Sequence, residues 1–284
     1  MNMVKTVLLM GLMTGLFLWV GHAIGGRQGM IIALVLAAGM NMDSYWFSDK
    51  IVLAMYSAQP VDAASAPGLY RLVADLAQRD NLPVPKIYII PDESPNAFAT
   101  GRDPQHAAVV VTAGIMRLLS DDELSGVIAH ELSHVANRDI LISAVAATLA
   151  GALMVLVRIF AFSTMFYGGG GGGRDRRGGL EALALMIIAP IAALLIQMAI
   201  SRSREYQADA SGAKLCGNPK SLANALRKLE RGVENVPMDA QPQTAHMFIV
   251  NPLSGRSMMG LFSTHPPLEQ RIARLEEMAR TGQY

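Results

Sequence analysis

The chain has 284 residues, of which 51% are hydrophobic and only 17% are charged, and its mean hydropathy is +0.30. This composition is too apolar for a typical soluble enzyme and predicts membrane segments. The formal net charge of +1 argues against a nucleic-acid-binding protein, because such proteins carry a clear excess of Lys and Arg. The single cysteine, Cys216, excludes an internal disulfide framework and fits a reducing compartment.

Two apolar runs open the chain. The first, residues 7–24, is about as long as a bilayer core requires, and a short turn at 25–28 leads into the second, residues 29–42. A cleaved signal peptide would have a shorter apolar core and a cleavage site of small residues. The sequence therefore predicts an uncleaved hairpin of two membrane spans over residues 1–48, with the aromatic residues around Trp46 at the membrane interface.

Residues 49–139 have the polarity of a folded aqueous domain. Helical periodicity over residues 69–80 predicts a helix, and the runs 86–90 and 106–114 predict two strands. The sequence SDDE at 120–123 is typical of a capping box, in which the Ser side chain accepts from the N3 amide and the Glu side chain reaches back. It predicts the start of another helix.

An apolar segment, residues 140–200, interrupts this domain. Its two runs, 140–157 and 180–200, are separated by six consecutive glycines at 168–173 and by several arginines. Their length favours a third and a fourth membrane span. The arginines would then lie on the membrane face opposite the aqueous domain, against the positive-inside tendency, so a hydrophobic hairpin buried in the protein stays open as an alternative.

The tail, residues 201–284, is predicted to complete the aqueous domain. It contains a helix through REYQADASGAKL, a second helix through NPKSLANALRKLERG, and a last helix that opens at two consecutive prolines, 266–267. The predicted fold class is therefore mainly α with a small β-sheet, within a multi-pass membrane protein.

The sequence HELSH at residues 130–134 has the spacing of a metal site. Residues i and i+4 of an α-helix share a face, so His130 and His134 can direct two imidazoles at one ion. Glu131 lies about a quarter turn away, where it reaches a water on that ion rather than the ion itself. This is the pattern of zinc hydrolases in which Glu acts as general base, and it predicts one zinc ion per chain.

A catalytic zinc site takes three protein ligands and leaves one position for water. No histidine occurs between residues 134 and 246, so a glutamate on a second helix is the alternative. Glu205 is the predicted third ligand, and Asp209, one turn later, is placed to orient a ligand imidazole through its free N–H. A solvated Glu on a charged helix face is the rival interpretation, but this pair directly follows the apolar segment that began just after His134.

Both ligand segments border the apolar segment 140–200, so both ligand helices are predicted to be aqueous continuations of two antiparallel apolar helices. The apolar segment would hold them side by side, with the zinc close to the membrane face. The expected partners are therefore the lipid bilayer and substrates embedded in it or attached to it, namely membrane proteins.

The motifs HELSHVANRD, SREYQADA and STHPPLEQRI, with the segment PNAFATG and the two N-terminal apolar runs, resemble the HtpX-type membrane zinc metalloproteases. These are gluzincin relatives of the prenyl-protein (CAAX) endopeptidases, and the resemblance extends over essentially the whole chain. It implies an endopeptidase of the bacterial inner membrane that degrades damaged or misassembled membrane proteins as part of a stress response. Residues 49–139 and 201–284 would be the two parts of its catalytic domain, which faces the cytoplasm.

The resemblance also suggests roles for residues outside the metal motif. His265 precedes the prolines of the last helix, where it either stabilises the oxyanion of the tetrahedral intermediate or caps the helix. The segment at Asn96, Ala97 and Phe98, with the strand at 106–114, is expected to form the edge along which an extended substrate pairs its backbone.

The predicted reaction is hydrolysis of a peptide bond, in which Glu131 accepts the proton of the attacking water and later delivers it to the leaving nitrogen. One rival is a narrow-specificity processing protease of the prenyl-protein type, which needs more spans than this chain supplies. The other is a non-catalytic membrane scaffold with structural zinc. That site needs a fourth protein ligand, and Cys216 would lie about 16 Å along the helix from Glu205. Self-cleavage in the glycines at 168–173 is a further expectation.

Overall fold

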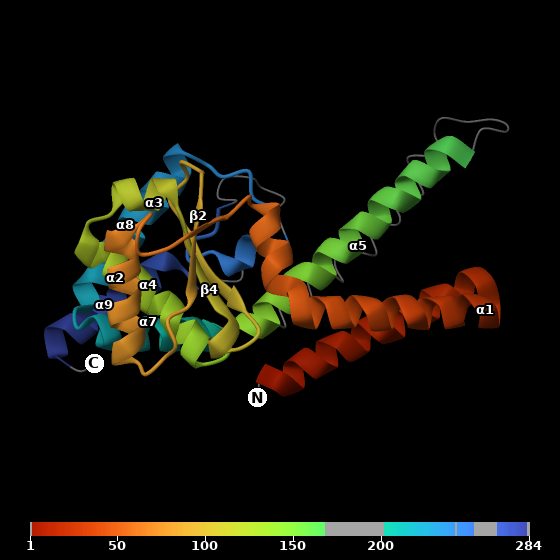
Figure 1. Cartoon of the computed structure of the whole chain (residues 1–284), viewed down its shortest axis with the longest axis horizontal. Coiled ribbons are helices and arrows are strands. Elements are labelled where there is room, and N and C mark those ends of the chain that lie inside the picture. Colours follow the sequence, from red (N-terminus) through yellow and green to blue (C-terminus); the bar gives the residue numbers. More distant parts are fainter. Residues whose placement is uncertain (1, 168–201, 242, 253–265, 283–284) are drawn as a thin grey trace.

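Two long helical segments leave the body of the molecule on one side, and shorter helices around a small sheet make up that body (Figure 1). The computed structural model describes residues 2–167, 202–241, 243–252 and 266–282. Three sequence predictions lie outside these residues: those on the apolar run 180–200, the glycines at 168–173, and His265.

The first segment, α1 (Asn2–Met55), is a helical hairpin rather than one rod. Its helix is broken at Gly25 and Gly26, and Gly26 has a φ of +54°, which favours glycine. The two arms are in close contact near the turn. A Cβ on Gly29 would collide with the backbone of Gly21, so only glycine fits there. Farther along the arms, the Asn41 side chain donates to the Thr14 hydroxyl at 2.9 Å. The structure places the break between the two helical arms at Gly25 and Gly26, within the segment 25–28 that was predicted to turn.

The second arm, Gly25–Met55, is long and apolar enough to cross a bilayer. The first arm contains a shorter apolar helix, Val4–Trp19. Large apolar side chains point outward from both arms, with Trp19 69% exposed and Val35 68% exposed. Such a surface is costly in water and favourable in hydrocarbon, so the hairpin has the surface of a membrane anchor.

The hairpin does not end at residue 48, because α1 continues into the body. Val52 and Leu53 are buried in a cluster with Phe98 of the sheet and Phe248, and Tyr56 packs edge-on against Phe248 with ring centroids 5.3 Å apart. The last turn of α1 and Tyr56 just after it therefore belong to the core of the body and fix the hairpin to it.

The sheet has four strands in the order β1-β2-β4-β3. β2 (Lys86–Ile90) and β4 (Ala107–Thr112) are parallel and correspond to the two predicted strands. β1 (Gln59–Val61) pairs antiparallel with β2, and β3 (Ala97–Gly101) pairs antiparallel with β4 at the opposite edge. A 3₁₀ turn, η1 (Pro104–His106), connects β3 to β4.

The central helix is α4 (Asp121–Ala136), which carries the HELSH motif. The predicted capping box is present: the Ser120 hydroxyl accepts from the Glu123 amide at 3.4 Å, and the Glu123 carboxylate accepts from the Ser120 amide at 2.9 Å.

The other helices of the body are α2 (Pro67–Arg79), α3 (Ala113–Leu118), α7 (Arg202–Cys216), α8 (Pro219–Asn235) and α9 (Leu268–Thr281). A 3₁₀ turn, η2 (Ala245–Met247), precedes the segment that covers β3. The apolar face of α4 packs against α7 and α8, which places the motif in the interior.

The second projecting segment, α5 (Ile140–Tyr167), is not a straight continuation of α4, so that prediction is wrong. The two helices are bent by 87°. α4 ends in a Schellman motif: the Arg138 amide donates to the Val135 carbonyl and the Asp139 amide donates to the His134 carbonyl. Arg138 has a φ of +56°, a position that glycine usually occupies, so the sequence carried no sign of this helix end.

Candidate metal centre

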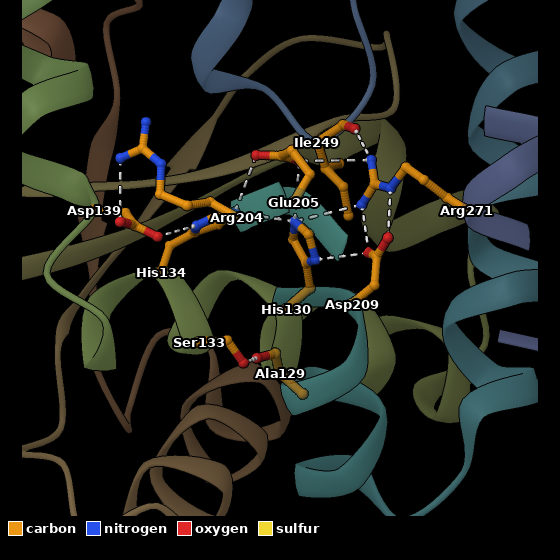
Figure 2. A network of polar contacts seen from close by, with 10 residues as sticks. All are labelled: Ala129, His130, Ser133, His134, Asp139, Arg204, Glu205, Asp209, Ile249 and Arg271. Atoms are coloured by element: carbon orange, nitrogen blue, oxygen red, sulfur yellow. Dashed lines mark hydrogen bonds and ion pairs between the residues drawn. The ribbon is translucent and has the colours of Figure 1, made fainter. Parts of the chain in front are cut away.

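The three predicted ligands come together between α4 and α7. The Nε2 atoms of His130 and His134 lie 3.2 Å apart. The Glu205 carboxylate lies 3.5 Å from Nε2 of His134 and 3.9 Å from Nε2 of His130. One donor atom from each residue falls within 4.8 Å of the others, so the cluster can hold a metal ion (Figure 2).

Glycines allow the helices to approach this closely. A Cβ on Gly212 of α7 would lie 2.8 Å from the His130 backbone nitrogen and 2.9 Å from its Cα. On the other side of α4, a Cβ on Gly126 would lie 2.7 Å from the Leu222 nitrogen of α8. Real side chains do not tolerate such contacts with backbone atoms, so each glycine sets the distance between two helices.

The His130 imidazole is held from behind by Asp209. Its Nδ1 lies 3.0 Å from the Asp209 carboxylate, as predicted for an aspartate one turn after the third ligand. Arg271 of α9 donates two hydrogen bonds to this carboxylate, at 2.7 and 2.8 Å, and a third to the Ile249 carbonyl at 3.0 Å. Burial would raise the pKa of Asp209, but the Arg271 charge and these hydrogen bonds lower it to about 2.

The His134 imidazole has its own carboxylate, Asp139. Nδ1 of His134 lies 3.3 Å from Asp139 Oδ2, and Arg204 approaches the other oxygen at 3.2 Å (Figure 2). Burial alone would lower the pKa of His134. The Asp139 hydrogen bond and the nearby carboxylates of Glu205 and Glu131 outweigh the effect of burial and raise the pKa to about 9.

Asp139, Arg204 and Arg271 were missed by the sequence analysis. Asp139 is five residues after His134, which on a straight helix is the wrong face, and only the bend after α4 returns it to the imidazole. Arg271 left a faint signal. It follows Leu268 by three residues and precedes Leu275 by four, so it lies on the apolar stripe of α9, where a charged residue needs a buried partner.

Glu131 lies in the same cavity, of about 40 Å³, which has room for an ion and a water. Glu131 is 2% exposed, and burial raises its pKa even though the charges of His130 and His134 oppose the shift. The backbone of Ala99 on β3 also acts to lower this pKa, but it does not outweigh the effect of burial. Glu131 is therefore positioned beside the ligand cluster with a raised proton affinity, as a general base requires.

The predicted substrate edge is partly covered by the chain itself. The side chain of Asn96 donates to the Val250 carbonyl at 2.8 Å and accepts from the Val250 amide at 3.3 Å. The Ala97 carbonyl accepts from the Ile249 amide at 3.0 Å, and Phe98 packs edge-on against another ring of the same segment. Of this strand, Ala99 is the residue that lines the cavity of the metal cluster.

Comparisons with known proteins identify the family of this chain. The model of peptidase family M48 matches residues 63–279. A "Protease HtpX homolog" of Syntrophobacter fumaroxidans is 56% identical over 277 residues, covering 96% of this chain and 98% of the relative. One from Thermodesulfovibrio yellowstonii is 57% identical over 280 residues, covering 99% of each chain.

Among solved structures, S. mikatae Ste24p is similar with a TM-score of 0.52 and 18% identity, over 97% of this chain but only 65% of that chain. At this identity the likeness concerns the fold alone. The match to the family model, the similarity to the HtpX homologues over nearly all of both chains, and the apolar arm of α1 lead to one conclusion. The chain belongs to peptidase family M48 and is a membrane-bound metalloprotease.

Proposed function

We propose that this chain is a gluzincin-type zinc endopeptidase, with His130, His134 and Glu205 as the zinc ligands. The observation that carries the proposal is the ligand cluster with Glu131 beside it in one cavity. Two imidazole nitrogens and one carboxylate are a donor set typical of catalytic zinc, which keeps a fourth position open for water. A fourth ligand that would close the site is absent among the residues that the structure describes.

In this proposal an aspartate carboxylate orients each of the two histidine ligands toward the ion. Asp209 and Asp139 each hold an Nδ1, which fixes the rings and leaves both Nε2 atoms to face the ion. Zinc in this position supplies a Lewis acid that polarises the scissile carbonyl and lowers the pKa of water. Glu131 takes the proton from the attacking water and delivers it to the leaving nitrogen.

The substrate would approach along the free part of β3 near Ala99, since the chain's own segment already bonds the carbonyl of Ala97. Asn96, Ala97 and Phe98 would then support this edge from behind, with Ala99 facing the substrate. His265 remains our candidate for oxyanion stabilisation or for capping of α9.

We further propose that the enzyme is multi-pass in a bacterial inner membrane, with the body in the cytoplasm, and that it degrades damaged membrane proteins. Support comes from the position of the site. Three residues separate α4, which carries two ligands, from α5, and α5 packs against the N-terminal hairpin through Leu9 and Met13. Membrane-protein substrates would therefore reach the site from the adjacent bilayer, and self-cleavage in the glycines at 168–173 remains part of the proposal.

The test compares full-length wild type with Glu131→Gln, purified in detergent with chelator and then supplied with zinc. We expect both proteins to bind one zinc ion, and only wild type to cleave an unfolded model protein such as casein. Loss of the general base should slow turnover by about 10²–10⁴-fold. Glu234→Gln, an exposed substitution on α8, is the matched control and should be fully active.

Each outcome separates the proposals. Zinc binding without cleavage by wild type would favour the scaffold interpretation or a narrow specificity of the prenyl-protein type. Equal cleavage by wild type and Glu131→Gln would show that Glu131 is not the base. In the His134→Ala variant, both zinc binding and cleavage should be lost.

A further inference from the structure

A second cavity, of about 510 Å³, lies beside the metal centre and reaches the foot of the N-terminal hairpin. Its lining comes from both arms of α1, the turn after β3, the bend between α4 and α5, and the start of α7. Thr6 of the first arm and Tyr45 of the second arm line the cavity. The ion pair between Arg204 and Asp139 lines this cavity and the metal cavity alike, so it forms part of the wall between them.

Among the described residues that line this second cavity, arginines outnumber carboxylates by one. Three arginines line it, Arg102, Arg138 and Arg204, against two carboxylates, Asp103 and Asp139. Both carboxylates already contact a histidine and an arginine of the chain. The planar donors of arginine favour a ligand with several anionic oxygens, and a phosphate can accept from them in pairs.

The aromatic residues nearby relate the cavity to the membrane. The Arg102 guanidinium lies 4.7 Å from the ring centroid of Trp46, which is 46% exposed, and Tyr45 next to it lines the cavity. Trp and Tyr concentrate where hydrocarbon meets the lipid headgroups. The cavity thus lies at headgroup level, a step that rests on the proposed membrane placement of α1.

We propose that this cavity binds the phosphate of an anionic phospholipid headgroup, with Arg102 and Arg138 as its guanidinium contacts. The headgroup would enter between the foot of α1 and the bend after α4, one ion pair away from His134. A soluble phosphoester presents the same chemistry, and the experiment distinguishes the two sources.

The test uses full-length protein stripped of lipid in detergent, offered equal amounts of phosphatidylglycerol and phosphatidylcholine, with bound lipid counted by native mass spectrometry. Both lipids carry the phosphate, but the guanidinium groups repel the choline cation of phosphatidylcholine, so wild type should retain phosphatidylglycerol in about tenfold excess. The double variant Arg102→Gln with Arg138→Gln should lose the preference. Arg138→Lys, which keeps the charge, should retain most of it, and Arg71→Gln, exposed on α2, should retain all of it.

Zinc content, thermal stability and casein cleavage are measured on the same preparations without added lipid. An active wild-type enzyme that shows no lipid preference would overturn this inference while leaving the proposed function intact. An unchanged preference in the double variant would overturn it too. Glycerol 3-phosphate that displaces the lipid at millimolar concentration would identify a soluble phosphoester as the source, whereas absence of displacement supports the lipid headgroup.

Discussion

Each of the two imidazoles at the metal cluster is backed by a carboxylate and each carboxylate by an arginine. His130 contacts Asp209, which contacts Arg271, and His134 contacts Asp139, which contacts Arg204 (Figure 2). A carboxylate on Nδ1 fixes the ring and directs Nε2 to the ion, and the arginine keeps the carboxylate ionised. The first of these chains is almost fully buried, while His134 of the second is partly exposed.

The pKa of His134 leads to a prediction about metal affinity. Zinc binds only the unprotonated imidazole, so below about pH 9 a proton must leave His134 for the ion to bind. The apparent zinc affinity should therefore fall by about tenfold from pH 8 to pH 7, as measured by chelator competition. The variant Asp139→Asn removes a cause of the raised pKa, so its affinity should vary less over this range. An affinity of wild type that is constant between these pH values would contradict the prediction.

Arg271 should be essential for stability because it neutralises a buried carboxylate. Arg271→Met keeps most of the side-chain volume but leaves Asp209 without its guanidinium partner, which should lower the free energy of unfolding by about 3–5 kcal/mol. Chemical denaturation measures this loss. Arg274→Met on the same helix removes only a guanidinium that stacks on the Tyr206 ring, so it should cost less than about 1 kcal/mol. Equal losses for both variants would disprove the role given to Arg271.

At the scale of elements, the site depends on how closely α7 crosses α4. Glu205 and Asp209 lie on α7, both histidines lie on α4, and Gly212 touches the backbone at His130. A change of a few tenths of an ångström in this crossing moves one side of the cluster against the other. The distance between two helices is therefore part of the metal site.

The substitution Gly212→Ala tests this dependence. Its Cβ meets backbone atoms that cannot rotate away, so the helices must separate, and we expect a loss of about 1–3 kcal/mol in stability. Zinc affinity should fall by at least about tenfold, because the ligands move apart. Gly68→Ala in α2 is the matched control: its Cβ meets open space and should stabilise the protein by up to about 1 kcal/mol. Wild-type zinc affinity in Gly212→Ala would contradict this account.

At the scale of the whole molecule, the body and the apolar segments are joined at two places. The end of α1 is inserted into the core of the body, and the bend after α4 sends α5 out beside the hairpin (Figure 1). The ligand helix itself stays within the body. The site is therefore next to the proposed membrane surface without being part of a spanning helix.

The proposed orientation can be measured by labelling single cysteines in a Cys216→Ser background. Arg27→Cys is at the tip of the hairpin and should react with a membrane-impermeant maleimide added to intact spheroplasts. Gln78→Cys, exposed on α2, should react only after lysis, because the body would lie in the cytoplasm. The reverse labelling pattern would place the body on the opposite side, and labelling of both would argue against the spanning hairpin.

Several elements of the fold and part of the metal site could be predicted from the sequence alone. The hairpin with its glycine turn, the helix that starts at Ser120, the strands β2 and β4, and the four-residue spacings within HELSH and between Glu205 and Asp209 all follow from local patterns. Periodicity, capping and the i, i+4 spacing depend on neighbours in the chain, so they can be read before the fold is known.

Only the tertiary structure decided which distant groups meet. Arg271 reaches Asp209 across 62 residues, and the segment at Ile249–Val250 covers an edge that was predicted to be open to substrate. The bend after α4 rests on a left-handed Arg138, which no local preference of arginine predicts. A buried charge or an unpaired strand edge is stable only when remote parts of the chain supply its partners, and the left-handed turn at Arg138 has a conformational cost that the rest of the fold must offset.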